Sequence, residues 1–255
     1  MQYVAFLDVL GFKDMVENSC HTKLYNVYKN LFISNAEMAL SNGKYKVVEG
    51  QDGEVAVADL SEIQVQCLVV SDSVILWAND ASMKSFIDIC VTAGRLVLAG
   101  VYTGLPMRGA ISMGELSSIS ASAGQGNALN VQTVFGLGLV QAYREERRHE
   151  WAGIVVEDHC IENYQQQSKA AALESEVADL EYLTKVGLLR CYDVPLKNET
   201  LESRWTVNWP KLNRGGVTER AVRESFGRHN KATQDSSVQR KIANTLAYVQ
   251  ESPVT

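Results

Sequence analysis

The spacing of apolar residues changes along the chain and predicts the order of its first elements. Residues 3–10 are rich in β-branched and aromatic side chains and end at Gly11, which predicts a strand followed by a glycine turn. Apolar positions three or four residues apart between Leu24 and Ala39 predict a long helix that ends at Gly43. The chain therefore opens with a strand, a turn and a helix.

Two apolar runs in the first half of the chain predict a hairpin with a carboxylate at its tip. Residues 62–70 and 73–77 are separated only by Ser71-Asp72, the form of a tight turn between paired strands. The remaining expected elements are a loose hairpin over 45–57 with its tip at Asp52-Gly53, a helix capped by Ser82 and ending near Gly100, a strand over 107–115, a small-residue loop over 117–127, a helix over about 133–148, a strand over 153–156, a polar helix over 169–185, a strand over 188–194, an aromatic segment over 205–210 and a last helix over 237–250.

This order, β-α-β-β-α-β-α-β with additions, predicts the fold class. We expect an α+β fold in which helices pack on one face of a mostly antiparallel sheet, as in ferredoxin-like and palm-like domains. Repeated β-α pairs, which a doubly wound or barrel fold would require, are missing from the pattern. Residues 1–160 are expected to form the core, and residues 161–255 to complete or extend the same domain.

Composition and charge narrow the classes of partner. The 24 Lys and Arg residues against 30 Asp and Glu give a net charge of −6, which argues against a nucleic-acid or membrane surface but allows a local basic pocket for a phosphorylated small molecule. The five cysteines are scattered without a CxxC motif, so we expect a reducing, cytoplasmic location. The first residues lack a signal-peptide pattern, and Arg95 interrupts the longest apolar stretch, residues 87–101, so no membrane insertion is expected.

Two carboxylates are candidates for a metal site. Asp8 lies at the carboxyl end of the first predicted strand, in phase with Val4 and Phe6, and Asp72 lies at the tip of a hairpin expected to pair beside it. Taken alone, an aspartate at a strand end more often caps a turn. Carboxylate oxygens on rigid strands, with further ligands from phosphates and water, suit Mg²⁺ at nucleotide sites, so the pairing of Asp8 with Asp72 favours a metal role.

Groups that could bind phosphate lie close by in the sequence. Gly11 and Phe12 form the turn into a helix N-terminus, where amides favour phosphate, although most such glycines only let the chain turn. Arg108 lies in a strand of small and apolar residues and either reaches solvent or faces a site, where its planar fork would suit phosphate oxygens. The P-loop, GxGxxG, GxSxG and HExxH motifs are all missing, so histidine or serine chemistry is not expected.

Several motifs carry a family resemblance. The sequence FLDVLGF at 6–12 resembles the first metal motif of class III nucleotide cyclases, and VSDS at 70–73 resembles their second metal hairpin. The sequence MRGAISMG at 107–114 is similar to their arginine strand, and GLGLVQAYR at 136–144 falls where their catalytic helix lies. Together with YDVP at 192–195 and NWP at 208–210, these motifs look most like the pyrimidine cyclases of bacterial Pycsar antiphage systems.

The resemblance implies a metal site and an assembly. Asp8 and Asp72 would hold two divalent cations, Mg²⁺ or Mn²⁺, with the Val9 carbonyl as a further ligand. The class builds its sites between two cyclase domains, and this chain has room for one, so a homodimer with composite active sites is implied. Arg144 would then enter from the opposite protomer.

The resemblance also implies how the triphosphate is bound. The amides of Gly11 and Phe12 and the guanidinium of Arg108 would bind phosphate oxygens, while Arg144 would neutralise charge that develops at the α-phosphorus. The implied reaction converts a nucleoside triphosphate to its 3′,5′-cyclic monophosphate and pyrophosphate.

Departures from the family pattern bear on the substrate. Purine cyclases carry charged base-reading residues where this chain has Leu68 and Thr133, which implies a pyrimidine substrate but does not separate uracil from cytosine. We favour UTP over CTP. The resemblance to the Pycsar cyclases also implies a cyclic nucleotide signal for a separate antiphage effector. One alternative is a cytidylate cyclase that makes cyclic CMP. Val140 replaces the usual asparagine four residues before Arg144, so the other alternative is a catalytically inactive nucleotide-binding dimerisation module. A palm-type diguanylate cyclase or polymerase is disfavoured because VSDS replaces the GG[DE]EF hairpin.

Overall fold

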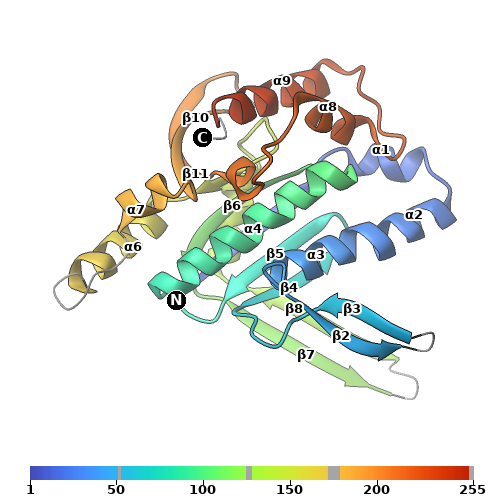
Figure 1. Cartoon of the computed structure of the whole chain (residues 1–255), viewed down its shortest axis with the longest axis horizontal. Coiled ribbons are helices and arrows are strands. Elements are labelled where there is room, and N and C mark those ends of the chain that lie inside the picture. The colour runs from blue at the N-terminus through green and yellow to red at the C-terminus, as the bar shows by residue number, and fades with distance from the viewer. Residues whose placement is uncertain (51–52, 125–127, 172–178, 253–255) are drawn as a thin grey trace.

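A seven-stranded sheet forms the centre of the computed structural model, which describes residues 1–50, 53–124, 128–171 and 179–252 (Figure 1). The strand order is β10-β11-β9-β6-β1-β5-β4. The strands are β1 (Gln2–Val9), β4 (Val65–Val70), β5 (Ser73–Ala78), β6 (Met107–Gly114), β9 (Ile154–Val156), β10 (Leu189–Pro195) and β11 (Leu201–Val207). Every neighbouring pair is antiparallel except β6 and β9. The expected α+β class with a mostly antiparallel sheet is confirmed.

The four strands β6, β1, β5 and β4 have the connectivity of a split βαβ unit. A helical segment and a separate hairpin over residues 45–58 join β1 to β4, a tight turn joins β4 to β5, and one long helix joins β5 to β6. Strand β1 therefore lies at the centre of the sheet, between β5 and β6. Any side chain near the end of β1 has strand neighbours on both sides.

The helices surround this sheet. They are α1 (Phe12–Glu17), α2 (His21–Val27), the π-helical turn η1 (Tyr28–Phe32), α3 (Ile33–Leu40), α4 (Met83–Thr103), α5 (Leu137–Glu146), α6 (Asp158–Ala171), α7 (Leu180–Lys185), the 3₁₀ turn η3 (Trp209–Leu212), α8 (Glu219–Gly227) and α9 (Ser236–Gln250). Ser82 caps α4 as expected, because its side chain accepts a hydrogen bond from the Ser85 amide.

Helix α4 forms the main core with one face of the sheet. Its Phe86 ring packs against Tyr3 of β1, with ring centroids 5.2 Å apart, and Ile89 and Leu96 are fully buried. Among the described residues, α4 is the one helix long and apolar enough to cross a membrane. Its 21 residues extend beyond both ends of the apolar stretch 87–101 identified in the sequence. Packing against the sheet accounts for its apolar composition.

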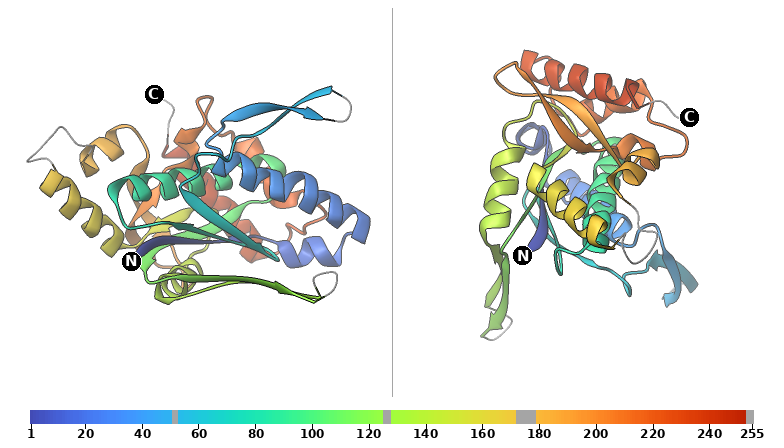
Figure 2. Two further views of the ribbon diagram at one scale, coloured as in Figure 1. Left: turned by 90° about the horizontal axis from the view of Figure 1, so that it is seen from below. Right: turned by 90° about the vertical axis from the view of Figure 1, so that its left-hand side faces the viewer.

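Helix α5 lies on the opposite face of the sheet, as the right-hand view of Figure 2 shows. The expectation of helices on one face only is therefore wrong. Alternate residues of β1, Val4 and Phe6, point to this second face and form a small apolar cluster with Leu68 and Ile75, which needs cover from water. Contact is close because Gly114 of β6 and a glycine of α5 meet backbone to backbone.

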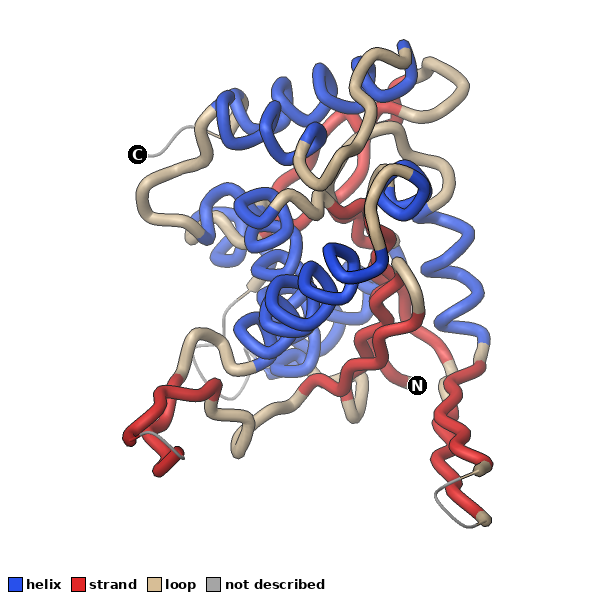
Figure 3. The backbone as a smooth tube through the Cα atoms, turned by 90° about the vertical axis from the view of Figure 1, so that its right-hand side faces the viewer, coloured by secondary structure: helices blue, strands red, loops and turns tan. Residues whose placement is uncertain are grey.

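Two hairpins extend from the body (Figure 3). One pairs β2 (Tyr45–Gly50) with β3 (Gly53–Ala58), as predicted, although Asp52 at its tip lies outside the described residues. The other pairs β7 (Ser117–Ala123) with β8 (Leu129–Phe135), where the sequence predicts a loop and then a helix from Thr133. The loop prediction is wrong because both strands are exposed, so no buried face imposes an apolar alternation on their sequence, and residues 125–127 of the predicted loop lie outside the described residues. The predicted helix is present as α5, which begins at Leu137 and not at Thr133.

The C-terminal part continues the same sheet through β9, β11 and β10, across the predicted boundary at residue 160. Helix α6 begins at Asp158, not at Lys169 as the sequence predicts, and α7 forms the end of the predicted helix 169–185, of which residues 172–178 lie outside the described residues. The sequence pattern does not predict α8. Helices α6 and α8 are polar overall and bury only narrow faces, such as Ile161 and Tyr164 in α6. Few apolar residues therefore mark these helices in the sequence.

Candidate active site

Asp8 lies near the end of β1 and faces the same side of the sheet as α5. In the strand register it is opposite Ser73 of β5 and Arg108 of β6. Cross-strand partners share one face, so these three side chains are neighbours. The Ser73 hydroxyl donates a hydrogen bond of 3.4 Å to Asp8 Oδ1. The carboxylate is half-buried between these two strand neighbours and is hydrogen-bonded on the Ser73 side.

The Ser71-Asp72 turn brings a second carboxylate to the same end of the sheet. The Val9 amide, next to Asp8, donates a 3.0 Å hydrogen bond to the Asp72 carbonyl. Ser71 has a φ of 55°, in the left-handed region that tight hairpin turns require. The sequence predicts that Asp8 and Asp72 converge, and the backbone brings them together. Their role as metal ligands stays a prediction.

The charges around Asp8 set its ionisation. Burial first, and then the carboxylates of Glu146 and Asp72, raise the pKa of Asp8 to about 6, while Arg108 and the Ser73 hydroxyl oppose the rise. An ionised Asp8 is therefore repelled by two neighbours of the same sign. A divalent cation would relieve that repulsion, and carboxylate and hydroxyl oxygens are suitable donors for Mg²⁺ or Mn²⁺. The residues present fit such an ion.

Few side chains at this site could coordinate a metal ion. No group of three or more metal-ligating side chains gathers anywhere in residues 1–50, 53–124, 128–171 or 179–252. A cation at Asp8 and Asp72 would therefore complete its coordination with backbone carbonyls, water and substrate oxygens. Such a site binds metal most strongly when a phosphate substrate is present.

Arg108 has a different position from the one expected. Its side chain is 8% exposed and forms an ion pair with Glu146 of α5, and its Nη1 donates a 2.7 Å hydrogen bond to the His149 carbonyl. The guanidinium therefore faces the end of α5 and not the open side of the site. This geometry does not support the predicted direct contact with phosphate. Arg108 instead balances the carboxylates of Glu146 and Asp8.

The glycine turn follows directly after the first carboxylate. Gly11 has a φ of 76° and begins α1, which has six residues, and the Leu10 amide donates to the Pro106 carbonyl at 2.9 Å. Phe12 is half-buried, with its ring centroid 6.1 Å from that of Tyr28. The turn lies at the same end of β1 as Asp8, and phosphate binding by its amides stays a prediction.

Tyr28 is a residue that the sequence analysis missed. It begins the π-helical turn η1, and its hydroxyl donates a hydrogen bond to the carbonyl of Ser71, next to Asp72. Burial raises the pKa of Tyr28, and the Asp72 carboxylate adds to the rise. Tyr28 therefore links the Phe12 turn to the Asp72 turn. In the sequence it is one more apolar position of a helix, and its contact with Ser71 depends on the tertiary fold.

The two predicted base-reading residues are not brought together within one chain. Leu68 of β4 lies on the Asp8 face and is 9% exposed, in the cluster with Val4 and Ile75. Val134 of β8 also packs on that cluster. Since side chains alternate along a strand, the neighbouring Thr133 points away from it and is exposed.

Helix α5 presents an exposed surface that includes Arg144. Arg144 is exposed and forms no hydrogen bond or ion pair with any residue that the structure describes. Val140, one turn earlier, is 41% exposed, and Leu137 at the start of the helix is 59% exposed. Apolar side chains at this exposure around an unpaired cation are typical of a surface that another protein covers.

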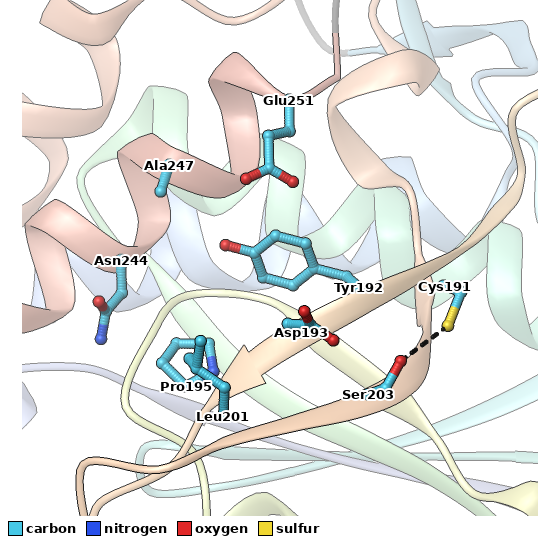
Figure 4. A pocket seen from close by; sticks show the side chains of 9 residues that line it. All are labelled: Cys191, Tyr192, Asp193, Pro195, Leu201, Ser203, Asn244, Ala247 and Glu251. Atoms are coloured by element: carbon cyan, nitrogen blue, oxygen red, sulfur yellow. Dashed lines mark hydrogen bonds between the residues drawn. The ribbon is translucent and has the colours of Figure 1, made fainter.

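A separate pocket of about 480 Å³ lies between the β10–β11 hairpin and α9 (Figure 4). Asp193 and Glu251 lie on either side of Tyr192 there, and the pKa of Tyr192 is raised to about 12 by burial first and by both carboxylates. The nine described residues that line the pocket include no Lys or Arg. A triphosphate would be repelled here, so Asp8 and Asp72 remain the better candidates for a nucleotide site.

Comparisons with known proteins give only distant likenesses. No family model and no curated protein matches the chain. A bacterial light-regulated adenylyl cyclase has 10% sequence identity and a TM-score of 0.46, with 88% of this chain and 54% of that chain covered. A class III adenylyl cyclase-like ATP-binding protein from Pseudomonas aeruginosa has 13% identity and a TM-score of 0.41, with 72% and 39% covered. This chain thus spans about half or less of each, and its function has to be argued from the site itself.

The crowded carboxylates predict a metal-dependent change in stability. The folded-state pKa of Asp8, about 6, lies above the ordinary value of 3.8. The fold therefore favours the protonated side chain, and the free energy of unfolding falls as the pH rises from 3.8 to about 6. Asp8→Asn should therefore increase the free energy of unfolding near pH 7 by about 1–2 kcal/mol. Mn²⁺ should raise the melting temperature of the wild type and not that of Asp8→Asn, as measured by thermal denaturation.

The control for this experiment is Asp193→Asn, in the acidic pocket of Figure 4. It should keep the full Mn²⁺ effect. If Asp193→Asn removed the effect and Asp8→Asn kept it, the cation would bind in the C-terminal pocket and the assignment to Asp8 would be wrong.

Tyr28→Phe tests the link between the two turns. Loss of the hydroxyl should lower the free energy of unfolding by about 1 kcal/mol and weaken the Mn²⁺ effect, because the Asp72 turn loses its hydrogen bond at Ser71. Tyr25→Phe, at an exposed tyrosine of α2, serves as the matched control for thermal denaturation. Equal behaviour of the two variants would show that the Tyr28 hydroxyl does not hold the turn.

Proposed function

We propose that the protein is a nucleotide cyclase that converts UTP to 3′,5′-cyclic UMP and pyrophosphate. The observation that carries this proposal is the convergence of Asp8 and Asp72 at the end of the central strand, beside the Gly11 turn. Oxygen donors next to backbone amides suit a triphosphate bound through divalent cations. The sequence motifs that resemble class III cyclases lie at these same positions.

Each residue of the site has a role in this proposal. Asp8 and Asp72, with the Val9 carbonyl, would hold two divalent cations, which when bound polarise the ribose 3′-hydroxyl and neutralise the triphosphate. The Gly11 and Phe12 amides would orient phosphate oxygens at the end of β1. In contrast to the sequence-based expectation, we assign Arg108 to charge balance behind Asp8, because its donors are directed at Glu146 and the His149 carbonyl.

A second copy of the chain would complete the site. Arg144 has no partner among the described residues, and the surface around it exposes Val140, Leu137 and the β7–β8 hairpin. In a homodimer with composite sites, Arg144 would reach the α-phosphate bound at the partner's carboxylates, where charge develops. The partner would cover the apolar side chains of α5 at the same time.

The choice of base rests on Leu68 and on the resemblance. The aliphatic side chain of Leu68 lies in an apolar cluster on the Asp8 face and offers no polar group to a purine edge. Thr133 points away from that cluster, so any contact with a base would occur across the homodimer. These features favour a pyrimidine, and within that class we propose UTP before CTP. The resemblance further suggests a cytoplasmic signalling role in which cyclic UMP activates a separate antiphage effector.

The competing proposal is an inactive nucleotide-binding module that dimerises. Val140 supports it, because the resemblance places a transition-state asparagine there and valine cannot donate a hydrogen bond. Binding without turnover would distinguish it from a cyclase.

Turnover can be tested directly. The purified protein with Mn²⁺ and an equimolar mixture of the four ribonucleoside triphosphates should produce mainly cyclic UMP, identified by mass spectrometry. Asp8→Ala and Asp72→Ala should each lose at least about tenfold in rate, or 1.4 kcal/mol of transition-state stabilisation. Dominant cyclic CMP would refute the choice of UTP, and dominant cyclic AMP or cyclic GMP would refute the pyrimidine assignment.

A mixing experiment tests the composite site. Asp8→Ala and Arg144→Ala proteins, each inactive alone, should regain roughly a quarter of wild-type activity when mixed, because random exchange gives about half heterodimers with one intact site each. Arg147→Ala, three residues further along the same exposed helix end, should remain active alone. Full activity of Arg144→Ala alone would show that Arg144 has no catalytic role.

A further inference from the structure

The segment between α8 and α9 packs against the predicted phosphate turn at Gly11 and Phe12. Residues 228–231, which we call the strap, lie against the end of α4 and the loop after α1 (Figure 1). His229 Nε2 lies 2.7 Å from the Thr103 carbonyl, and Asn230 exchanges two hydrogen bonds with Asn18, of 2.8 and 3.2 Å. His229 and Asn230 have φ values of 61° and 62°, which non-glycine residues adopt at a cost.

The strap ends in a buried lysine. Lys231 is 6% exposed, and its Nζ donates hydrogen bonds to the carbonyls of Gly104, at 2.9 Å, and Leu10, at 3.4 Å. Its aliphatic stem lies so close to Gly11 that a Cβ there would be 2.8 Å from Lys231 Cδ. Lys231 therefore contacts Gly11 of the predicted phosphate turn and the preceding residue, Leu10.

The Lys231 ammonium group is buried with carbonyl oxygens as its hydrogen-bond partners. No carboxylate of the described residues forms an ion pair with Lys231, and Asp14 of α1 acts on it only from a distance. Burial lowers the pKa of Lys231 to about 7. An apolar side chain of similar length would fill this space at a lower desolvation cost. An anion bound at the neighbouring turn would offset that cost.

We propose that Lys231 is a positioning residue for the phosphate turn, which holds the Leu10 carbonyl and the left-handed Gly11 so that the following amides can bind the triphosphate. The inference rests on the proposed function and adds to it a residue of the C-terminal region, 220 positions from Gly11 in the sequence. It also explains why the strap is fixed by hydrogen bonds at both ends.

Steady-state kinetics with the nucleotide and Mn²⁺ test the proposal. Lys231→Met should raise KM about tenfold, equivalent to 1.4 kcal/mol, with kcat changed less than about threefold and with little change in melting temperature. Lys231→Gln keeps a hydrogen-bond donor without the charge and should raise KM less. Lys241→Met, which removes a lysine paired with Glu150 in α9, is the matched control and should leave KM unchanged.

The outcomes separate this inference from the proposed function. An unchanged KM with a lowered melting temperature in both Lys231 variants would overturn it and leave Lys231 purely structural. If the wild type shows no turnover, the proposed function fails, and calorimetric titration with pyrophosphate and Mn²⁺ decides about Lys231. Binding that weakens about tenfold in Lys231→Met supports the inference. Equal binding by the wild type and the variant, or no binding by either, overturns it.

Discussion

The register of the central strand places the Asp8 carboxylate between Ser73 and Arg108, and the rest of the site is arranged around this half-buried charge. Arg108 is already paired with Glu146, so it offsets Asp8 only in part, and the pKa of Asp8 stays above its ordinary value. Asp72 adds a second negative charge nearby. The protein thus keeps an electrostatic imbalance at the end of β1, which a divalent cation with a phosphate substrate would correct.

Other energetically unfavourable features lie at the same end of the sheet. Ser71, His229 and Asn230 have left-handed backbone conformations, and Lys231 is a buried ammonium group. Each is held by hydrogen bonds from another element, such as that from the Tyr28 hydroxyl to the Ser71 carbonyl. Strained and desolvated groups that cluster in this way are typical of functional sites, because folding alone would select against them.

Local pattern predicts much of this fold. The first strand, the hairpin around Asp72, the Ser82 cap and the arginine strand each follow from spacing or turn chemistry within a few residues. The β7–β8 hairpin is missed because Ser117–Ala123 is exposed on every residue, so its sequence has no apolar alternation. Convergence of Asp8 and Asp72 is predictable because it needs only strand order. The Arg108–Glu146 pair, Tyr28 and Lys231 are not, since each depends on contacts between segments distant in the sequence.

The most direct test of this account is a crystal structure with Mn²⁺ and a non-hydrolysable UTP analogue, in which anomalous scattering locates the cations. We expect anomalous peaks about 2.2 Å from the carboxylate oxygens of Asp8 and Asp72, with the analogue's phosphates next to Gly11. Peaks confined to other acidic surfaces, such as the pocket at Asp193 and Glu251, would contradict it.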